Sequence, residues 1–239
     1  MTVNEQDIAH SGELSPLLKE LGAYLDNYLQ FEDPDAMKNA AVWQHALNQA
    51  VPEKGLGVAG VMQIIGQQLI PNGSQIPKPS CTAFITTGAT SIGVLAGLSS
   101  SVASPQRIGL TAFSYLEEIS LNWMRDLFEL SPLMKGVYSS GGSSANIIAL
   151  GAARQWAFEK IGIDPAENGM TRPCRIYASS ECHHTIQRAA AVLGLGRQSV
   201  VKIPVDEQGC LDPLVLHELI NKDKNDDQPW LPIAIVANA

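Results

Sequence analysis

The last third of the sequence alternates short apolar segments with segments of helical periodicity. The apolar segments RIYA (175–178), SVVKI (199–203) and IAIVA (233–237) are typical of buried strands, and residues 183–193 and 211–220 between them have a helical pattern. This alternation predicts an α/β fold, a mostly parallel sheet with helices on both faces.

Polar and small residues follow the ends of these predicted elements. In open α/β sheets, ligands bind outside the carboxyl ends of the strands. Residues 139–144, 179–184 and 238–239 are expected at that edge. We therefore expect a functional site where these three segments converge.

Residues 136–160 combine a run of small residues with a helix rich in Ala, Ile and Leu. We expect a short strand end at 137–138 and a tight turn in which the glycines at 141–142 relieve steric clashes. Ser143 or Ser144 is expected to cap the helix. The remaining N–H groups and the positive end of the helix dipole suit a phosphate group. The same residues would also form a simple capped turn without a ligand, so neighbouring segments decide between the two interpretations.

Two adjacent histidines, His183 and His184, follow the strand expected at 175–178. With Cys182 they lie too close together in sequence to share one metal ion comfortably, because helical ligand pairs are three or four residues apart. We therefore expect no metal. One imidazole could instead stack on a flat ligand ring whose phosphate is bound near Ser143. Without a phosphate nearby, His183 would be an ordinary, partly exposed histidine.

Two other sites are disfavoured by the sequence. The serine-rich turn does not contain the G-x-S-x-G nucleophile elbow, since residues 141–145 are Gly-Gly-Ser-Ser-Ala. Gly55, Gly57 and Gly60 spell G-x-G-x-x-G, but the preceding residues are not strand-like. Neither a serine hydrolase nor a dinucleotide site is favoured.

Composition limits the partners and the compartment. A net charge of −8 and a pI near 5.1 argue against nucleic acid and anionic membranes. The polar N-terminus does not resemble a signal peptide, and no run of about 18 apolar residues is present. The four cysteines are far apart and form no C-x-x-C pair. We expect a cytoplasmic protein with reduced thiols.

The N-terminal part is expected to be helical and extended. Residues 14–30 form an amphipathic pattern whose apolar face needs a partner, either another domain or a second copy of the chain. Residues 110–130 form a second such pattern, with Trp123 and Phe128 expected in a core. We place the division between an N-terminal segment, 1–100, and a larger ligand-binding domain, 101–239.

Several motifs, taken in order, resemble a known enzyme family. They are FITTGATS, LEEISLNWMRDLF, YSSGGSSANIIALGAAR, SSECHHTIQRAA and IVANA. Together they resemble the pyridoxal-phosphate-dependent group II amino-acid decarboxylases, which include the aromatic-amino-acid, glutamate, tyrosine, histidine and 2,4-diaminobutyrate enzymes. The resemblance extends from about residue 12 to the last residue.

The resemblance implies a fold-type-I large domain, like that of aspartate aminotransferase, preceded by a helical dimerisation segment in a homodimer. It implies pyridoxal 5'-phosphate as cofactor. Gly142 and Ser143 would bind the cofactor phosphate, with Ser144 close by, and His183 would stack on the pyridine ring. The substrate pocket would be lined in part by four residues of the FITT segment: Phe84, Ile85, Thr86 and Thr87.

The sequence also departs from the family pattern. Lys78-Pro79 stands where the family normally has His-Pro, and Ser144 stands where many members have Glu. The lysine that forms the Schiff base and the aspartate that pairs with the pyridine nitrogen are expected beyond Ala239. We therefore interpret the chain as a truncated, N-terminal part of the enzyme that is inactive by itself.

The sequence thus predicts that the full-length parent decarboxylates an L-amino acid. The residues do not indicate which amino acid it is. Another fold-type-I lyase or a transaminase remains an alternative. A non-catalytic module for phosphate binding or dimerisation is a further alternative from a different class.

Overall fold

The protein is described by a computed structural model that covers residues 14–30, 40–51, 53–79, 81–82, 88, 90–103 and 111–237. The chain forms two compact units, Met1–Phe113 and Ser114–Ala239. The functional division predicted at residue 100 stays a prediction.

The first unit is helical in its described part. The helix expected at 14–30 is confirmed as α1, Leu14–Tyr28. It is followed by α2 (Ala40–Leu47), α3 (Gly57–Ile64), the π-helical turn η2 (Ile65–Leu69) and α4 (Ser91–Ala103). No strand precedes α3 within the described residues, which agrees with the weak dinucleotide motif there.

Helix α1 contacts the rest of its unit through two tyrosines. A Cβ atom at Gly66 in η2 would lie 2.3 Å from the ring of Tyr24, so this close approach requires glycine. The hydroxyl of Tyr28 donates to the carbonyl oxygen of Ser74, and the Lys78 Nζ lies 5.0 Å from the Tyr28 ring centroid. Burial raises the pKa of Tyr28. No residue of α1 is fully buried, however.

The second unit contains the predicted parallel sheet. Its strands are β1 (Cys174–Ser179), β2 (Val200–Ile203) and β3 (Leu231–Val236), in the order β2-β1-β3 with both pairs parallel. Each strand overlaps the segment predicted for it. Strand β1 is central, and five of its six residues are buried.

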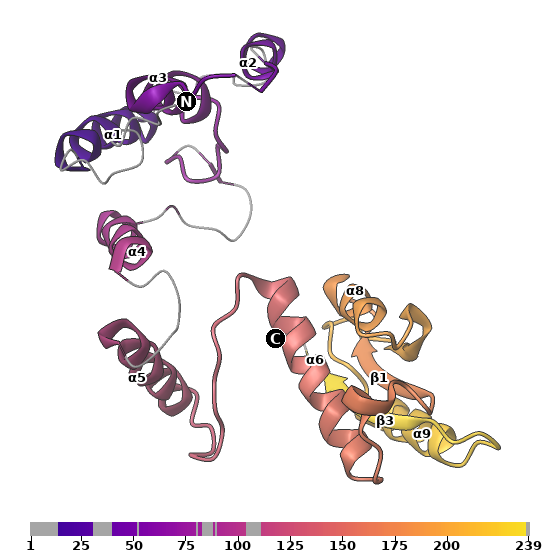
Figure 1. The fold of residues 1–239 in the computed structure, drawn as a ribbon. Helices are drawn as coiled ribbons and strands as arrows, with labels where there is room; N and C mark the ends of the chain where they lie inside the picture. The colour runs from indigo at the N-terminus through magenta and orange to yellow at the C-terminus, as the bar shows by residue number, and fades with distance from the viewer. Residues whose placement is uncertain are drawn as a thin grey trace. The chain divides into compact units, whose positions relative to one another are not determined.

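Helices cover both faces of this sheet (Figure 1). Cys174, Ile176 and Ala178 belong to one buried cluster with residues of α6 (Gly142–Glu159) and α8 (Thr185–Val192). Successive side chains of a strand point to opposite faces. Tyr177 therefore points the other way, where its hydroxyl bonds Asp223 of α9 (Pro213–Lys224). The predicted covering of both faces is confirmed. Two short helices, α7 (Pro165–Asn168) and η3 (Arg197–Ser199), also belong to this unit.

Helices α6 and α8 run parallel to each other. The Asn146 side chain donates to Thr185 Oγ1 at 2.8 Å, and Arg154 Nη1 donates to the Leu193 carbonyl oxygen at 3.0 Å. Both bonds join residues that are 39 positions apart, so the chain runs in the same direction along the two helices. Their N-termini therefore lie side by side. Because α8 follows β1 directly, this end of the helix pair is also the carboxyl end of β1.

Helix α5 (Ala112–Leu127) confirms the second predicted amphipathic helix. The expectation that Trp123 and Phe128 lie in a core was wrong, because they are 60% and 65% exposed. The helical pattern identified an apolar face, but not a partner that covers it.

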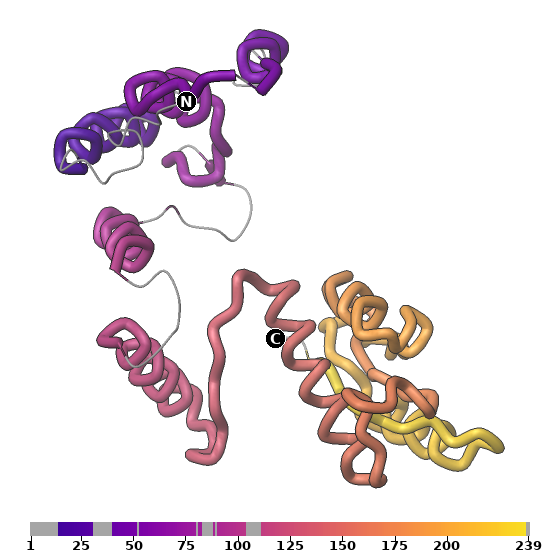
Figure 2. The backbone as a smooth tube through the Cα atoms, viewed as in Figure 1, coloured from indigo at the N-terminus to yellow at the C-terminus, as the bar shows by residue number. Residues whose placement is uncertain are grey.

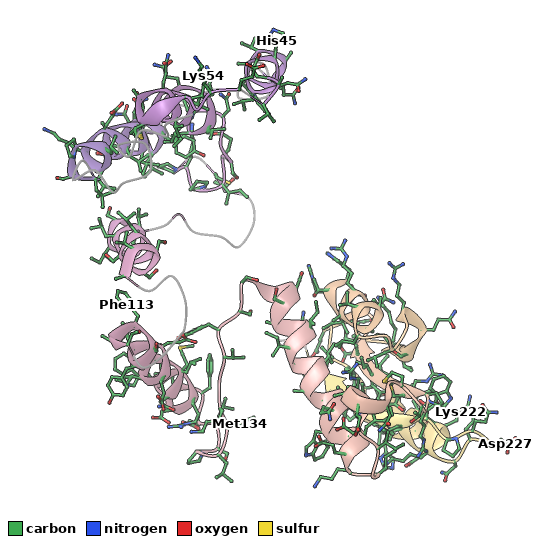
Figure 3. The ribbon with its side chains drawn as sticks, viewed as in Figure 1. His45, Lys54, Phe113, Met134, Lys222 and Asp227 are labelled. Atoms are coloured by element: carbon green, nitrogen blue, oxygen red, sulfur yellow. The ribbon has the colours of Figure 1, made fainter. Side chains whose placement is uncertain are left out.

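The short strand end expected at 137–138 was also wrong. Figure 2 shows an extended stretch between α5 and α6, which residues 134–139 form after a turn at 132–133. Val137 and Tyr138 are exposed and are not part of the described sheet. Tyr138 instead donates from its hydroxyl to Ser120 Oγ in α5 at 3.1 Å. A β-prone sequence without a neighbouring strand forms no ladder.

Among the helices that the structure describes, none is long and apolar enough to cross a membrane.

Candidate functional site

The turn that begins α6 depends on Gly141. Its backbone has φ 155° and ψ 172°, a region that is essentially restricted to glycine. Gly141 is also the N-cap, and no side chain caps the helix. The expectation that Ser143 or Ser144 caps it was wrong, because the helix already begins at Gly142. Ser144 Oγ instead lies 3.0 Å from Ser140 Oγ.

The first N–H groups of α6 are open to a ligand. The first backbone bond of the helix runs from the N–H of Ala145 to the carbonyl oxygen of Gly141 at 2.9 Å. The N–H groups of residues 142–144 therefore have no acceptor within the helix. Gly142 and Ser143 are exposed, and a Cβ at Gly142 would meet nothing within 4 Å. Free N–H groups, open space and a positive helix dipole together fit a phosphate group.

A tight turn after β1 positions His183. Ser179 closes this turn: its Oγ accepts from the N–H of Glu181 at 3.0 Å, and its carbonyl accepts from the N–H of Cys182, also at 3.0 Å. The Cys182 side chain is buried beneath the turn, while His183 is exposed. The structure thus presents an imidazole beside the start of α8.

The second histidine of the pair is held close to the first. The ring centroids of His183 and His184 are 4.1 Å apart, with an angle of 36° between the ring planes. The pKa of His184 is lowered, first by partial desolvation and then by the positive charges available to His183 and Arg188. His184 therefore takes up a proton less readily than an ordinary histidine.

Positive electrostatics come from elsewhere at the same edge. Lys202 in β2 donates from Nζ to the carbonyl oxygen of Ser180 at 3.0 Å, just beyond the end of β1. The N-termini of α6 and α8 contribute the positive ends of two parallel helix dipoles. This combination favours an anion. No three His, Cys, Asp or Glu side chains among the described residues lie together as a metal site would require.

Thr185 connects helix α6 with His183 at this edge of the sheet. Its Oγ1 accepts from Asn146 of α6 at 2.8 Å and lies 2.9 Å from His183 Nδ1. Neither Asn146 nor Thr185 was expected in the site. Both positions could have been noticed from their polar side chains: Asn146 carries an amide just before the apolar residues 147–150 of α6, and Thr185 carries a hydroxyl two residues after His183.

The structure brings together four of the predicted site residues at one edge of the sheet. Gly142, Ser143 and Ser144 lie in the first turn of α6, and His183 precedes α8. The predicted pocket residues Phe84, Ile85, Thr86 and Thr87 lie outside the described residues, as do residues 238–239. The ligand roles of all these residues stay predictions.

Comparison with known protein families identifies the family of the chain. The model of the pyridoxal-dependent decarboxylase conserved domain matches residues 40–239. The chain belongs to the pyridoxal-dependent decarboxylase family. The resemblance inferred from the ordered motifs is thereby confirmed.

Relatives with curated functions agree with this assignment. The chain is 24% identical over 219 residues to an aromatic-L-amino-acid decarboxylase of Bacillus atrophaeus, covering 89% of this chain and 43% of the relative. It is 35% identical over 103 residues to human cysteine sulfinic acid decarboxylase, covering 42% of this chain and 20% of the relative. The chain therefore spans less than half the length of these two relatives.

Solved structures confirm the fold. The glutamate decarboxylase domain of a diaminobutyrate-pyruvate transaminase and L-2,4-diaminobutyrate decarboxylase from Vibrio parahaemolyticus superposes with a TM-score of 0.82 at 22% identity, covering 95% of this chain and 51% of that one. The Oryza sativa protein TDC, solved with PLP and tryptamine, gives 0.70 at 20% identity, covering 98% and 49%. The predicted α/β fold of the pyridoxal-phosphate-dependent decarboxylases is thus confirmed.

Proposed function

We propose that the protein containing this chain is a pyridoxal-phosphate-dependent carboxy-lyase that releases carbon dioxide from an L-amino acid. One observation carries the proposal: the open N-terminus of α6 and the exposed imidazole of His183 lie at the same carboxyl edge of the sheet, in a member of the pyridoxal-dependent decarboxylase family. A flat, phosphorylated cofactor could bind its phosphate at the N-terminus of α6 and lay its ring against His183, which supports the proposal.

The residues fit the cofactor phosphate. The N–H groups of Gly142 and Ser143 and the Ser143 hydroxyl would bind it, with Ser144 close by. The empty space in front of Gly141 and Gly142 leaves room for the phosphate oxygens. An uncapped N-terminus is also chemically reasonable here, because a bound phosphate would satisfy the N–H groups that no side chain satisfies.

His183 would lie against the flat ring of the cofactor. The turn at residues 180–184 sets the backbone position of His183, and Thr185 contacts the Nδ1 atom of its ring. When bound, pyridoxal phosphate supplies the electron sink that accepts the electrons released with carbon dioxide. The chain's own contribution is to bind the phosphate and to restrict the orientation of the ring.

Phe84, Ile85, Thr86 and Thr87 are proposed to line part of the substrate pocket. The decarboxylases named above are named for aromatic amino acids, cysteine sulfinic acid and L-2,4-diaminobutyrate. The proposal therefore extends to an L-amino acid as the substrate class and no further.

The decisive experiment uses the purified full-length protein, stripped of cofactor and then reconstituted. A panel of L-amino acids labelled at the carboxyl carbon is supplied with and without pyridoxal phosphate. Cofactor-dependent release of labelled carbon dioxide is expected from at least one aromatic, acidic or diamino substrate. A transaminase would yield a keto acid and retain the label, and a protein that gives neither product would contradict the proposal.

We also propose that the protein is a cytoplasmic homodimer whose dimer contact includes α1. The support is the amphipathic pattern of α1, whose residues are not buried within their own unit. Leu14 is 52% exposed, for example. Light scattering of the full-length protein should give twice the monomer mass, and cell fractionation should recover it in the cytosol; a monomer or a membrane-associated protein would contradict the respective proposal.

A further inference from the structure

Asn146 and Thr185 make a partly buried hydrogen-bond connection between the two helices at the site. The Asn146 Nδ2 donates to Thr185 Oγ1 at 2.8 Å, although the residues are 39 positions apart in the sequence. Thr185 is only 6% exposed. A buried hydroxyl requires hydrogen-bond partners, since an unpaired one costs about 1–3 kcal/mol. The connection is therefore a defined part of the packing between α6 and α8.

The second partner of Thr185 is the ring of His183. Thr185 Oγ1 lies 2.9 Å from His183 Nδ1, and the backbone N–H of Thr185 is directed at the same nitrogen at 3.4 Å. This N–H belongs to the first residue of α8 and has no acceptor within the helix. The imidazole nitrogen thus takes the place of a cap.

These contacts determine where the proton of the neutral ring resides. An N–H group can only donate, so the backbone of Thr185 needs a lone pair on Nδ1. Because Thr185 Oγ1 already accepts from Asn146, its own hydroxyl proton is available for Nδ1 as well. Two donors therefore meet at Nδ1, which leaves the ring proton of neutral His183 on Nε2.

We propose that Asn146 and Thr185 are positioning residues that hold His183 in the Nε2–H tautomer and in one ring orientation. The relay starts on α6, the helix whose N-terminus is the proposed phosphate site, and ends at the ring that would lie against the cofactor. These hydrogen bonds therefore connect the proposed phosphate site on α6 with the ring of His183. The tautomer follows from this chain's own geometry, whereas the benefit for cofactor binding rests on the proposed function.

The tautomer can be measured directly by nitrogen NMR of the cofactor-free, full-length protein labelled at histidine ring nitrogens. The spectra are recorded at about pH 8, above the ordinary titration range of imidazole. The His183 signal is assigned by its loss in His183→Gln. In the wild type, Nδ1 should appear unprotonated and Nε2 protonated. Thr185→Ser, which retains the hydroxyl, should preserve this pattern, whereas Thr185→Val should yield a mixture of tautomers.

Asn146→Ala provides a second variant in which Thr185 and its backbone N–H remain in place. It should shift the tautomer balance less than Thr185→Val, because it retains both donors to Nδ1, whereas Thr185→Val retains only the backbone N–H. A protonated Nδ1 in the wild type, or an unchanged His183 spectrum in folded Thr185→Val, would overturn the proposal. The wild-type spectrum decides the tautomer even if Thr185→Val does not fold.

Cofactor affinity is the second measurement, by fluorescence titration with pyridoxal phosphate. Thr185→Val should weaken binding by about tenfold, comparable with the loss of an outer-shell partner at a metal site. Thr185→Ser should restore binding to within about twofold of the wild type. If Thr185→Val binds the cofactor as the wild type does, the coupling is wrong. If the wild type shows the tautomer but binds no cofactor, the proposed function fails while the hydrogen-bond relay stands.

Discussion

The hydroxyl of Tyr177 in β1 donates a 2.7 Å hydrogen bond to the carboxylate of Asp223 in α9. Burial raises the pKa of this tyrosine far above its usual value, and the adjacent Asp223 carboxylate adds to the effect. Tyr177 therefore remains a donor throughout the physiological range. The bond attaches α9 to the face of the sheet opposite α6 and α8, so it supports the strand from which the turn before His183 emerges.

Replacing Tyr177 by phenylalanine should destabilise this unit. The Asp223 carboxylate, whose side chain is 14% exposed, would retain the ion pair with Arg175 Nε at 3.7 Å as its one remaining side-chain partner among the described residues. Loss of a buried hydrogen bond to a charged group costs about 2 kcal/mol. Urea unfolding followed by circular dichroism should show the midpoint of Tyr177→Phe shifted to lower urea. Tyr115→Phe, at an exposed tyrosine in α5, should have little effect; equal midpoints for both variants would contradict the prediction.

Gly141→Ala should strain the turn before α6. The backbone at Gly141 lies in a region that other residues occupy only at a cost of about 1–3 kcal/mol. Gly142→Ala is the matched variant, because Gly142 is already helical and an added Cβ meets nothing within 4 Å. The free energy of unfolding should fall for Gly141→Ala and stay the same or rise for Gly142→Ala. The reverse order would show that the turn does not depend on Gly141.

The sequence predicted the strands of the second unit well, for an identifiable reason. Each of β1, β2 and β3 is a short apolar run that ends in polar or turn-forming residues, so both its length and its bounds are encoded locally. The segment at 137–138 has a similar composition, yet it forms no strand because strand formation needs a neighbour. Trp123 in α5 illustrates the same limit for a helix, since periodicity does not reveal which surface covers it.

The candidate site was predictable only in part, for a related reason. Gly142, Ser143 and His183 were identified because small residues and an imidazole at strand ends have recognisable chemistry. The bond from Asn146 to Thr185 depends on the parallel alignment of α6 and α8, which no local pattern encodes. The position of the cap was misjudged because a glycine N-cap offers no side chain to recognise.

Ser143→Asp should separate helix stability from cofactor binding. A carboxylate in the first turn of α6 interacts favourably with the helix dipole and should stabilise the fold by about 0.3–1 kcal/mol. The same charge would repel a cofactor phosphate, and at about 4 Å near a protein surface this repulsion amounts to several kcal/mol. Pyridoxal phosphate affinity of the full-length protein should therefore fall at least a hundredfold.

Ser143→Ala is the control for that experiment. It removes one hydroxyl hydrogen bond and adds no charge, so it should weaken cofactor binding by only about fivefold to tenfold. Fluorescence titration measures both affinities, and thermal unfolding measures both stabilities. Unchanged affinity in a folded Ser143→Asp protein would place the phosphate away from the N-terminus of α6.

His184 should make the fold less stable in mild acid. Its pKa is lowered in the folded protein by partial desolvation, with the charges of His183 and Arg188 adding to it. The unfolded chain retains an ordinary imidazole pKa of about 6.5 and takes up the proton first as the pH falls. Because the unfolded state then binds more protons, stability decreases below about pH 6.5 and is fully present above it. His184→Gln should reduce this decrease, measured as the change in thermal unfolding midpoint between about pH 7.5 and pH 5.5. His217→Gln in α9 is the control, and an equal loss of stability in acid for wild type and His184→Gln would refute the assignment.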